Sequence, residues 1–315
     1  MIFYILLKTI PKTVKVLVSG SGGFIGKSLV SSLKARGHEV LLIVRDSRGA
    51  RKQEGAVLCD PVRGKFNPRD FEGADAVIHL AGRNIMRRWT DSVKAEIEHS
   101  RVAGTEFLAS ALLGLENPPK VFICASATGF YGNRDDEVLS ERSGAGQGFL
   151  ARVAEKWENA ARAAGSATRV VNLRFGIVLA RDGAALKMMR IPFLLGLGAR
   201  IGDGSGYMSW ISKRDAVRAM EFILANDSVS GPVNIVSPTP MPNADFTRCL
   251  SRALRRPVFL SLSEPLIKFV LGEMGEEVIM SSVRVVPEKL INAGFHFEDG
   301  NLETFLRAEL GRTEL

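Results

Sequence analysis

The strongest constraint on the fold is a glycine-rich turn between a predicted strand and a predicted helix. Residues 14–19 (VKVLVS) are apolar and β-branched, as in a buried strand, and residues 24–36 follow with a helical pattern. Between them, Gly20, Gly23 and Gly26 give the spacing GxxGxxG. In that order they allow a tight turn, let the backbone approach a diphosphate, and let the helix pack on the strand. The pattern predicts a Rossmann-type dinucleotide site whose helix amides face the phosphates; a glycine-rich turn without a ligand is the alternative.

The chain then alternates between apolar strand patterns and helical patterns. We expect strands at 40–44, 56–58, 76–80, 121–125 and 169–175, and helices at 92–113 and 149–164. Such alternation is typical of βαβ units in a parallel sheet. The sequence predicts an α/β fold, a Rossmann-type doubly wound parallel sheet with a smaller C-terminal α/β substrate lobe. We expect the Rossmann domain over residues 13–182, completed by 208–237, and the substrate-binding lobe over 183–315.

The charge balance and the termini narrow the range of partners. Lys and Arg outnumber Asp and Glu by 42 to 34, which gives a net charge of +8. The basic residues are scattered and form no basic arm, so we expect a small-molecule substrate and no nucleic acid. The apolar run 1–7 is too short to span a bilayer. We predict an extra strand or a packed arm there and no stable membrane insertion, and a homodimer is left open.

Three widely spaced cysteines, Cys59, Cys124 and Cys249, match neither a disulfide framework nor a zinc site. Cys59 and Cys124 lie in apolar, strand-like runs, where buried free thiols are expected. This composition predicts no metal centre and favours a reducing, cytoplasmic location.

The end of the second predicted strand bears on cofactor choice. NAD-selective sites place an acidic residue there, which accepts a hydrogen bond from the 2′-hydroxyl of the adenosine ribose. In the alignment that we favour, Val44 takes the acidic position and Arg45 follows it. A guanidinium suits a 2′-phosphate in charge and in geometry, and Arg48 and Arg51 could assist. This pattern predicts NADP(H); the alternative is that Asp46 binds the ribose.

Several motifs resemble the extended short-chain dehydrogenase/reductase superfamily. They are the glycine turn, HLAG at 79–82 and SATGFYG at 126–132. The chain is most similar to a branch described as NAD(P)-dependent epimerase family proteins with a C-terminal domain of unknown function. That resemblance rests on the segment 81–105, a Trp-Glu pair at 157–158, the segment 210–215, GPVNIVSPTP at 231–240 and VVPEKLINAGFHF at 285–297.

The resemblance implies a dinucleotide lying across the sheet edge. Along the pyrophosphate it places Gly20, Gly23, Phe24, Ile25 and Gly26, and along the ribose Leu80, Ala81 and Gly82. Asp60 would lie near the adenine and Arg45 at the 2′-phosphate. Ser126 matches the catalytic Ser/Thr of the family, which hydrogen-bonds the reacting oxygen.

One part of the superfamily pattern is missing. Most members carry a Tyr-xxx-Lys pair on the helix after the fifth strand, in which the tyrosine is the acid/base. Here Leu150 and Ala154 stand at those positions. Tyr131 is the nearest tyrosine to Ser126 and is a candidate catalytic residue; a packed aromatic that shapes the cofactor pocket is the alternative.

Three further aromatic residues are candidates for the substrate pocket: Trp89, Tyr207 and Trp210. The two tryptophans flank predicted loops at the sheet edge, where ligands of parallel sheets bind. Core packing for the tryptophans and surface packing for Tyr207 are the alternatives.

The sequence predicts NADP(H)-dependent oxidoreduction of an unknown small molecule by hydride transfer. A nucleotide-sugar epimerase or dehydratase is one alternative, although both reactions normally use the absent tyrosine. A non-catalytic NADPH-binding sensor or regulatory protein is another.

Overall fold

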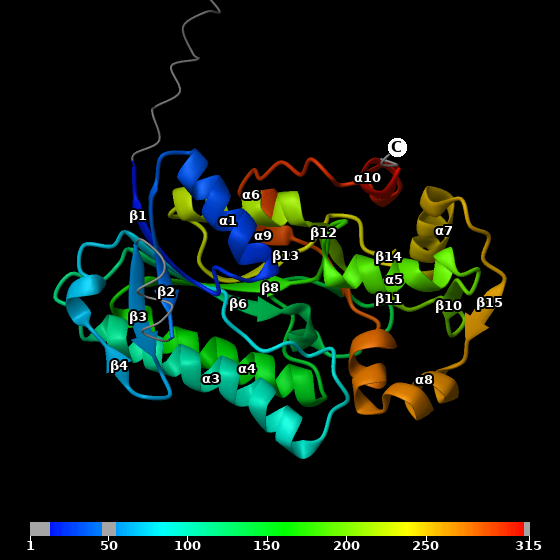
Figure 1. The fold of residues 1–315 in the computed structure, drawn as a ribbon, viewed down its shortest axis with the longest axis horizontal. Helices are drawn as coiled ribbons and strands as arrows, with labels where there is room; N and C mark the ends of the chain where they lie inside the picture. Colours follow the sequence, from blue (N-terminus) through cyan, green and yellow to red (C-terminus); the bar gives the residue numbers. More distant parts are fainter. Residues whose placement is uncertain (1–12, 46–54, 312–315) are drawn as a thin grey trace, which may run out of the picture.

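An eight-stranded sheet runs through the centre of the protein in the computed structural model, which describes residues 13–45 and 55–311 (Figure 1). The strand order is β13-β8-β6-β5-β1-β2-β3-β4, and all neighbours are parallel except β3 and β4. In chain order the strands are β1 (Lys15–Ser19), β2 (Glu39–Val44), β3 (Ala56–Asp60), β4 (Lys65–Phe66), β5 (Ala76–His79), β6 (Val121–Ala127), β8 (Arg169–Phe175) and β13 (Gly231–Ile235).

Helices cover both faces of this sheet (Figure 1). On one face lie α1 (Phe24–Ala35) and α6 (Lys213–Ala225), which pack on the side chains of Val16, Val18 and Ile78. On the other face lie α3 (Asp91–Leu113) and α4 (Phe149–Arg162), which pack on Leu17 and Val77. Successive side chains of a strand alternate between faces, so strands buried on both faces must be apolar at almost every position. The predicted doubly wound parallel sheet is confirmed.

The strand order reverses at β1. The chain runs from β1 outward through β2 and β3, and returns to the other side of β1 as β5. In open parallel sheets, the crevice outside the carboxyl ends of two such strands is where ligands bind. The loops that follow Ser19 of β1 and His79 of β5 therefore flank the expected ligand crevice.

The segment after β8 contributes to both parts of the molecule. β12 (Trp210–Ser212) pairs with β9 (Ile177–Leu179), and α6 and β13 then complete the large sheet. Leu290 and Phe295 also pack into the core beside α6, although they lie much later in the chain.

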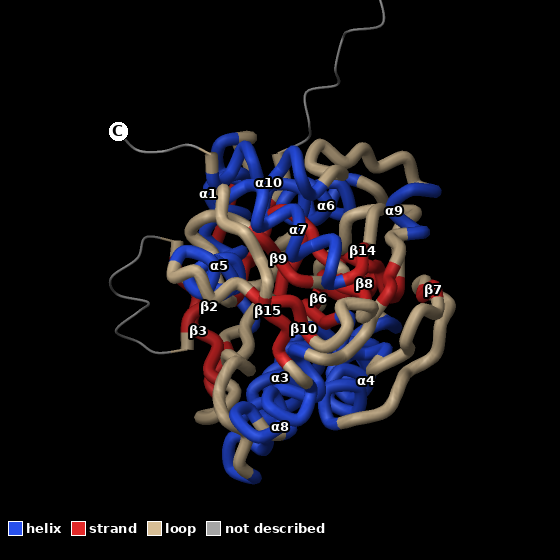
Figure 2. The backbone as a smooth tube through the Cα atoms, turned by 90° about the vertical axis from the view of Figure 1, so that its right-hand side faces the viewer, coloured by secondary structure: helices blue, strands red, loops and turns tan. Residues whose placement is uncertain are grey.

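The C-terminal lobe lies beyond the carboxyl ends of the strands and faces the viewer in Figure 2. Its helices are α5 (Ala184–Leu194), α7 (Asn243–Leu254), α8 (Glu264–Leu271) and α10 (Leu302–Leu310), and its strands are β10 (Ala199–Ile201), β11 (Tyr207–Met208), β14 (Met241–Pro242) and β15 (Leu260–Leu262). Short elements complete the structure: η1 (Pro68–Asp70), η2 (Thr128–Tyr131), β7 (Val138–Leu139), η3 (Ala163–Ser166), the π-helical turn η4 (Gly275–Ile279), β16 (Arg284–Val285) and α9 (Glu288–Asn292).

Some sequence predictions fall on residues outside the described ranges, namely the arm at 1–7 and the residues Asp46, Arg48 and Arg51. Among the helices of the two described ranges, none combines the length and the apolar character needed to cross a membrane.

Candidate dinucleotide site

The glycine turn after β1 is held tightly against the loop after β5. Gly20 has a φ of +70°, and a Cβ atom there would lie 2.7 Å from the carbonyl carbon of Leu80. Gly23 N donates to Gly20 O at 2.9 Å, which closes the turn. A Cβ on Gly26 would overlap the carbonyl oxygen of Gly20. Only glycine fits at Gly20 and Gly26, so the two predicted functions of these residues, a tight turn and close packing, are present in the structure.

The first turn of α1 is suited to an anion. Its N-cap residue Gly23 provides no side-chain hydrogen bond, and the turn carries no acidic residue. The amides at a helix N-terminus lack intrahelical partners and carry the positive end of the helix dipole. Nothing on α1 itself neutralises these groups, which is the arrangement that binds a phosphate.

Phe24 joins this turn to the rest of the molecule. Lys213 Nζ lies 4.7 Å from the centre of the Phe24 ring. A Cβ on Gly183 would lie 2.7 Å from the tip of that ring. The half-buried Ile25 packs against the core.

Ser19 and His79 pair beneath the glycine turn. They are register partners on β1 and β5, and Ser19 Oγ lies 2.6 Å from His79 Nδ1. Burial lowers the pKa of His79 to about 4, so the ring is neutral at pH 7. His79 Nε2 is buried and has no hydrogen-bond partner among the described residues. His79 therefore supports the sheet edge and is no proton donor at neutral pH.

The residues predicted for the adenosine and ribose lie at the same edge. Arg45 is exposed immediately after β2. Asp60 is buried, and its carboxylate accepts from Val62 N at 3.0 Å and Arg63 N at 3.3 Å.

Leu80, Ala81 and Gly82 follow β5, and a Cβ on Gly82 would lie 3.6 Å from the Arg101 guanidinium. Arg101 Nη2 donates to Arg83 O at 2.9 Å, and burial lowers the pKa of Arg101 to about 10. Arg101 thereby holds the loop after β5 against α3.

Ser126 belongs to a buried polar network. Its Oγ donates to Glu158 Oε1 at 2.7 Å, and Arg174 holds the same carboxylate through Nε and Nη2, both at 2.8 Å. Ser126, Glu158 and Arg174 are each at most 3% exposed. Ser126 is the register partner of Arg174, which is in turn the partner of Asn234. A row of polar side chains thus crosses three neighbouring strands under α4.

Tyr131 extends this network and is fully buried. Its hydroxyl accepts from Arg174 Nη1 at 2.9 Å and donates to Asn234 Oδ1 at 2.7 Å. Burial raises the pKa of the Tyr131 phenol, against a lowering effect of Arg174. The arrangement is that of the alternative considered from the sequence, a packed aromatic residue.

Leu150 and Gly129 meet where the usual tyrosine is missing. A Cβ on Gly129 would lie 3.3 Å from Leu150 Cβ, so α4 presents Leu150 to the turn that follows β6. Thr128 begins that turn, is half-buried, and makes no side-chain hydrogen bond to any described residue. Thr128, two residues after Ser126 in the sequence, was not among the site residues predicted from the sequence.

The three aromatic residues predicted for a substrate pocket lie in different surroundings. Trp89 is half-buried, packs edge-to-face on Phe149 with ring centres 5.1 Å apart, and donates through Nε1 to Ile85 O at 2.9 Å. Tyr207 is half-buried under the Arg284 guanidinium, 4.6 Å from the ring centre. Trp210 is fully buried and stacks on Phe305 in the lobe core. Trp89 alone lies beside the start of α4.

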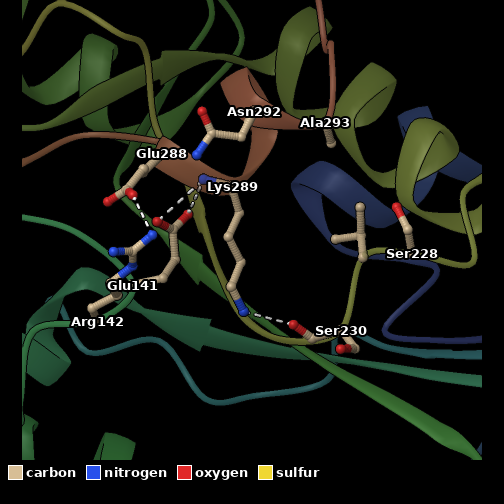
Figure 3. A pocket seen from close by; sticks show the side chains of 9 residues that line it. Glu141, Arg142, Ser228, Ser230, Glu288, Lys289, Asn292 and Ala293 are labelled. Atoms are coloured by element: carbon tan, nitrogen blue, oxygen red, sulfur yellow. Dashed lines mark hydrogen bonds and ion pairs between the residues drawn. The ribbon is translucent and has the colours of Figure 1, made fainter.

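Two cavities among the described residues bear on where a ligand could lie. The one in Figure 3, of about 340 Å³, is lined by Glu141, Arg142, Ser228, Val229, Ser230, Glu288, Lys289, Asn292 and Ala293. It lies before β13, at the amino end of a parallel strand, and contains none of the predicted site residues. Burial raises the pKa of Glu141 and lowers that of Lys289, whose Nζ donates to Ser230 O at 2.7 Å.

The second cavity, of about 510 Å³, lies at the start of α4 and is lined by Asn133, Arg134, Ala145, Gly146, Gln147 and Gly148.

Comparison with known proteins agrees with this geometry. The profile of the NAD dependent epimerase/dehydratase family matches residues 16–236, and that of a domain of unknown function (DUF1731) matches residues 262–309. Epimerase family protein Mb2239 of Mycobacterium bovis is 41% identical over 289 residues, which are 91% of this chain and 94% of that protein.

Two solved structures extend the comparison. The crystal structure of human epimerase family protein SDR39U1 (isoform 2) with NADPH has a TM-score of 0.85 at 32% identity, and the match covers 95% of this chain and 100% of that one. MoeE5 in complex with UDP-glucose and NAD has a TM-score of 0.72 at 19% identity over 94% and 97% of the two chains, a likeness of fold alone.

Proposed function

Because the chain belongs to the NAD-dependent epimerase/dehydratase family of extended short-chain dehydrogenases/reductases, we propose that it binds NADP(H) and oxidises or reduces a small molecule with it. The observation that carries this proposal is the uncapped first turn of α1 behind Gly20, Gly23 and Gly26. Its free amides and its lack of acidic side chains fit a pyrophosphate. A nicotinamide dinucleotide bound there would supply the hydride chemistry.

The preference for NADP(H) over NAD(H) rests on Arg45. It is exposed at the carboxyl end of β2, where no hydrogen bond or ion pair to a described residue engages its guanidinium. A planar guanidinium binds a phosphate bidentately. The human relative crystallised with NADPH supports the same choice.

We assign the substrate-facing hydroxyl to Thr128, the first residue after β6, and a positioning role to Ser126. The Ser126 proton is committed to Glu158 inside the core, and donating it elsewhere would break a buried hydrogen bond. Thr128 is the half-buried first residue of η2, just past the end of β6, and its hydroxyl makes no hydrogen bond to a described residue. Tyr131, whose phenol is buried and whose pKa is raised, is assigned to the support of this turn.

Two alternatives each have a supporting observation. A nucleotide-sugar epimerase or dehydratase is compatible with the family profile. A non-catalytic NADPH sensor is favoured by the side chains at the usual tyrosine and lysine positions, Leu150 and the buried Ala154, because neither can transfer a proton.

Cofactor titrations test the proposal directly. The dissociation constants of NADPH and NADH, followed by nicotinamide fluorescence, should differ in favour of NADPH for the wild type. Arg45→Ala should weaken NADPH binding by about 1.5–3 kcal/mol and leave NADH binding nearly unchanged. Arg69→Ala, which removes an exposed charge from η1, is the matched control. Equal losses for both dinucleotides in Arg45→Ala would refute the assignment of Arg45.

Measuring turnover distinguishes an NADP(H)-dependent enzyme from a non-catalytic NADPH sensor. A substrate panel that gives NADP(H) turnover in the wild type and much less in Thr128→Val supports the enzyme, whereas tight NADPH binding without turnover supports the sensor.

A further inference from the structure

Exposed apolar side chains are concentrated on one face of the C-terminal lobe. Of the fifteen large apolar side chains that are exposed among the described residues, eleven lie in two segments, 188–197 and 259–270. The first segment belongs to α5 and the loop after it, and the second contains β15 and α8. The most exposed are Phe259 (88%), Phe269 (87%) and Leu195 (69%). These eleven side chains are called the lobe patch below.

The two segments of the lobe patch meet at the small parallel sheet of the lobe. β10 pairs with β15, and Ala199 is the register partner of Leu260. Leu197 lies two residues before Ala199 and Phe259 lies one residue before Leu260, so both lie at the same end of this sheet. Figure 1 shows α5, β10, β15 and α8 together at the end of the molecule that Figure 2 turns to the viewer. The exposed apolar side chains therefore share one face of the protein.

The lobe patch is larger than the apolar surface that a monomer usually exposes. The exposed fractions of its eleven side chains add up to an area on the order of 1,000 Å². The largest apolar patch of a typical monomer covers about 300–600 Å². Each partner of a stable complex buries about 800 Å². The lobe patch thus has the area that a stable dimer needs.

β15 also presents a free sheet edge. Among the described residues it pairs with β10 alone, and Leu260, Ser261 and Leu262 are all exposed. Gly202 N donates to Leu262 O, so the backbone groups of Leu262 face β10. Because successive residues of a strand alternate in direction, the N–H and C=O groups of Ser261 point to the free edge. β15 carries no charged residue and no proline, the features that usually keep a free edge from pairing with another strand.

The charges that flank β15 favour an antiparallel partner. Arg255 and Arg256 lie before the strand and Glu264 lies after it, all three exposed and without an ion pair to a described residue. When two copies of β15 run antiparallel, the basic start of one lies beside the acidic end of the other, whereas a parallel pair would bring like charges together. A two-fold axis at Ser261 produces the antiparallel arrangement, in which the two Ser261 residues exchange both backbone hydrogen bonds.

We propose that the lobe patch is the interface of a two-fold symmetric homodimer in which β15 of one copy pairs antiparallel with β15 of the other. A second copy of the chain fits this face because a two-fold interface must be self-complementary. The apolar surface meets itself, the free edge pairs with its own counterpart, and the basic end of the strand meets the acidic end. The inference is independent of the proposed dinucleotide chemistry.

Sedimentation velocity of the full-length protein tests the oligomeric state. At micromolar concentration the wild type should sediment with twice the chain mass of 34.3 kDa. Phe259→Glu should weaken the dimer roughly a hundredfold or more, because each dimer loses two aromatic side chains and gains two carboxylates in an apolar interface. Phe269→Glu, on α8, is a second variant with the same expected direction. Val62→Glu, which changes a similarly exposed apolar side chain outside the lobe patch, is the matched control and should remain dimeric.

An engineered disulfide tests the position of the two-fold axis. The Cα atoms of a hydrogen-bonded antiparallel pair lie about 5.5 Å apart, within the range that a disulfide spans. Ser261→Cys should therefore form an intermolecular disulfide on mild oxidation and run as a covalent dimer on a non-reducing gel. Ser228→Cys, at an exposed serine outside the lobe patch, is the matched control. The wild type, whose cysteines are buried or half-buried, gives the background.

Circular dichroism shows that each variant is folded, which is expected because Phe259, Phe269 and Ser261 are all exposed. A wild type that is monomeric at about 100 µM would overturn the inference, as would a dimer that both Phe259→Glu and Phe269→Glu leave intact. Binding of a monomeric wild type to phospholipid vesicles would assign the lobe patch to a lipid surface instead. A covalent dimer no more abundant in Ser261→Cys than in Ser228→Cys would overturn the pairing of β15.

Discussion

Individual glycines set the distances at the dinucleotide turn. Gly20 lies against the backbone of Leu80, and Gly26 lies against the carbonyl of Gly20, so two loops and a helix meet without side chains between them. Gly22 lies in the same turn with nothing within 4 Å of the position its Cβ would take. A side chain would therefore be excluded at Gly20 and Gly26 but would fit at Gly22.

Gly26→Ala should lower stability and cofactor affinity together. The added methyl group would overlap Gly20 O and force the turn apart, an overpacking cost of about 1–3 kcal/mol. Gly22→Ala, the matched control, should change the free energy of unfolding by less than about 0.5 kcal/mol. Urea unfolding and an NADPH titration measure both effects. Equal behaviour of the two variants would show that the close packing at Gly26 is unimportant.

His79 should make stability depend on pH in a predictable window. Its pKa falls from 6.5 to about 4 on folding, so below pH 6.5 the unfolded chain binds a proton that the folded chain does not. The stabilisation is complete above about pH 6.5 and is lost as the pH falls toward 4, by about 3 kcal/mol in all.

Urea unfolding between pH 4 and pH 7 measures the pH effect as the difference between wild type and His79→Gln. That comparison cancels the contribution of Glu141, whose raised pKa acts in the opposite direction. If the free energy of unfolding changed equally with pH in the wild type and in His79→Gln, His79 would not be buried in its neutral form.

At the scale of elements, one face of the sheet changes from apolar to polar side chains toward the carboxyl ends of its strands. Under α3 and α4 the strands are apolar at Leu17, Val77 and Phe122. Farther along, the same face carries the row of Ser126, Arg174 and Asn234. Glu158 on α4 and Tyr131 in η2 complete the hydrogen bonds of this row, so two elements are positioned by one network at the edge where ligands bind.

Removing the charge of Glu158 should be strongly destabilising. Glu158→Gln leaves the Arg174 guanidinium buried without its ionic partner, which costs about 3–5 kcal/mol. Glu98→Gln breaks a solvent-exposed pair between α3 and Lys156 of α4 and should cost at most about 1 kcal/mol. Chemical denaturation of both variants makes the comparison.

The double variant Glu158→Gln/Arg174→Met removes both charges and should recover part of the loss. If Glu158→Gln were as stable as the wild type, the ion pair between Glu158 and Arg174 would contribute nothing to the stability of the fold.

At the scale of the whole molecule, the two parts of the chain are interleaved. α6 and β13 leave the lobe segment and complete the sheet, and Leu290 and Phe295 return to the core beside α6. In the other direction, Glu277 and Glu273 reach from the lobe to α4 and α3. Stability and ligand binding are therefore expected to depend on both parts at once.

A fragment of residues 1–182 should not fold on its own. It lacks β13 and α6, which leaves β8 as an uncovered edge and exposes the core face that α6 covers. The full chain should unfold in one transition in which circular dichroism and tryptophan fluorescence coincide. A cooperative transition in the 1–182 fragment, or two separated transitions in the full chain, would contradict this picture.

The sequence alone determined the parts of this protein that depend on short-range physics. A strand, a glycine turn and a helix in succession specify the dinucleotide turn, because backbone freedom at Gly20 and Gly26 and the apolar pattern of β1 are local properties. Near-continuous apolar strands likewise predict a parallel sheet covered on both faces. Only the tertiary structure decided which polar side chains meet. The Ser126 hydroxyl turns inward because Glu158 lies under it, and Glu277 reaches Leu150 across 127 residues. Such contacts depend on how distant segments pack, and no local pattern at Ser126 or Glu277 encodes the partner.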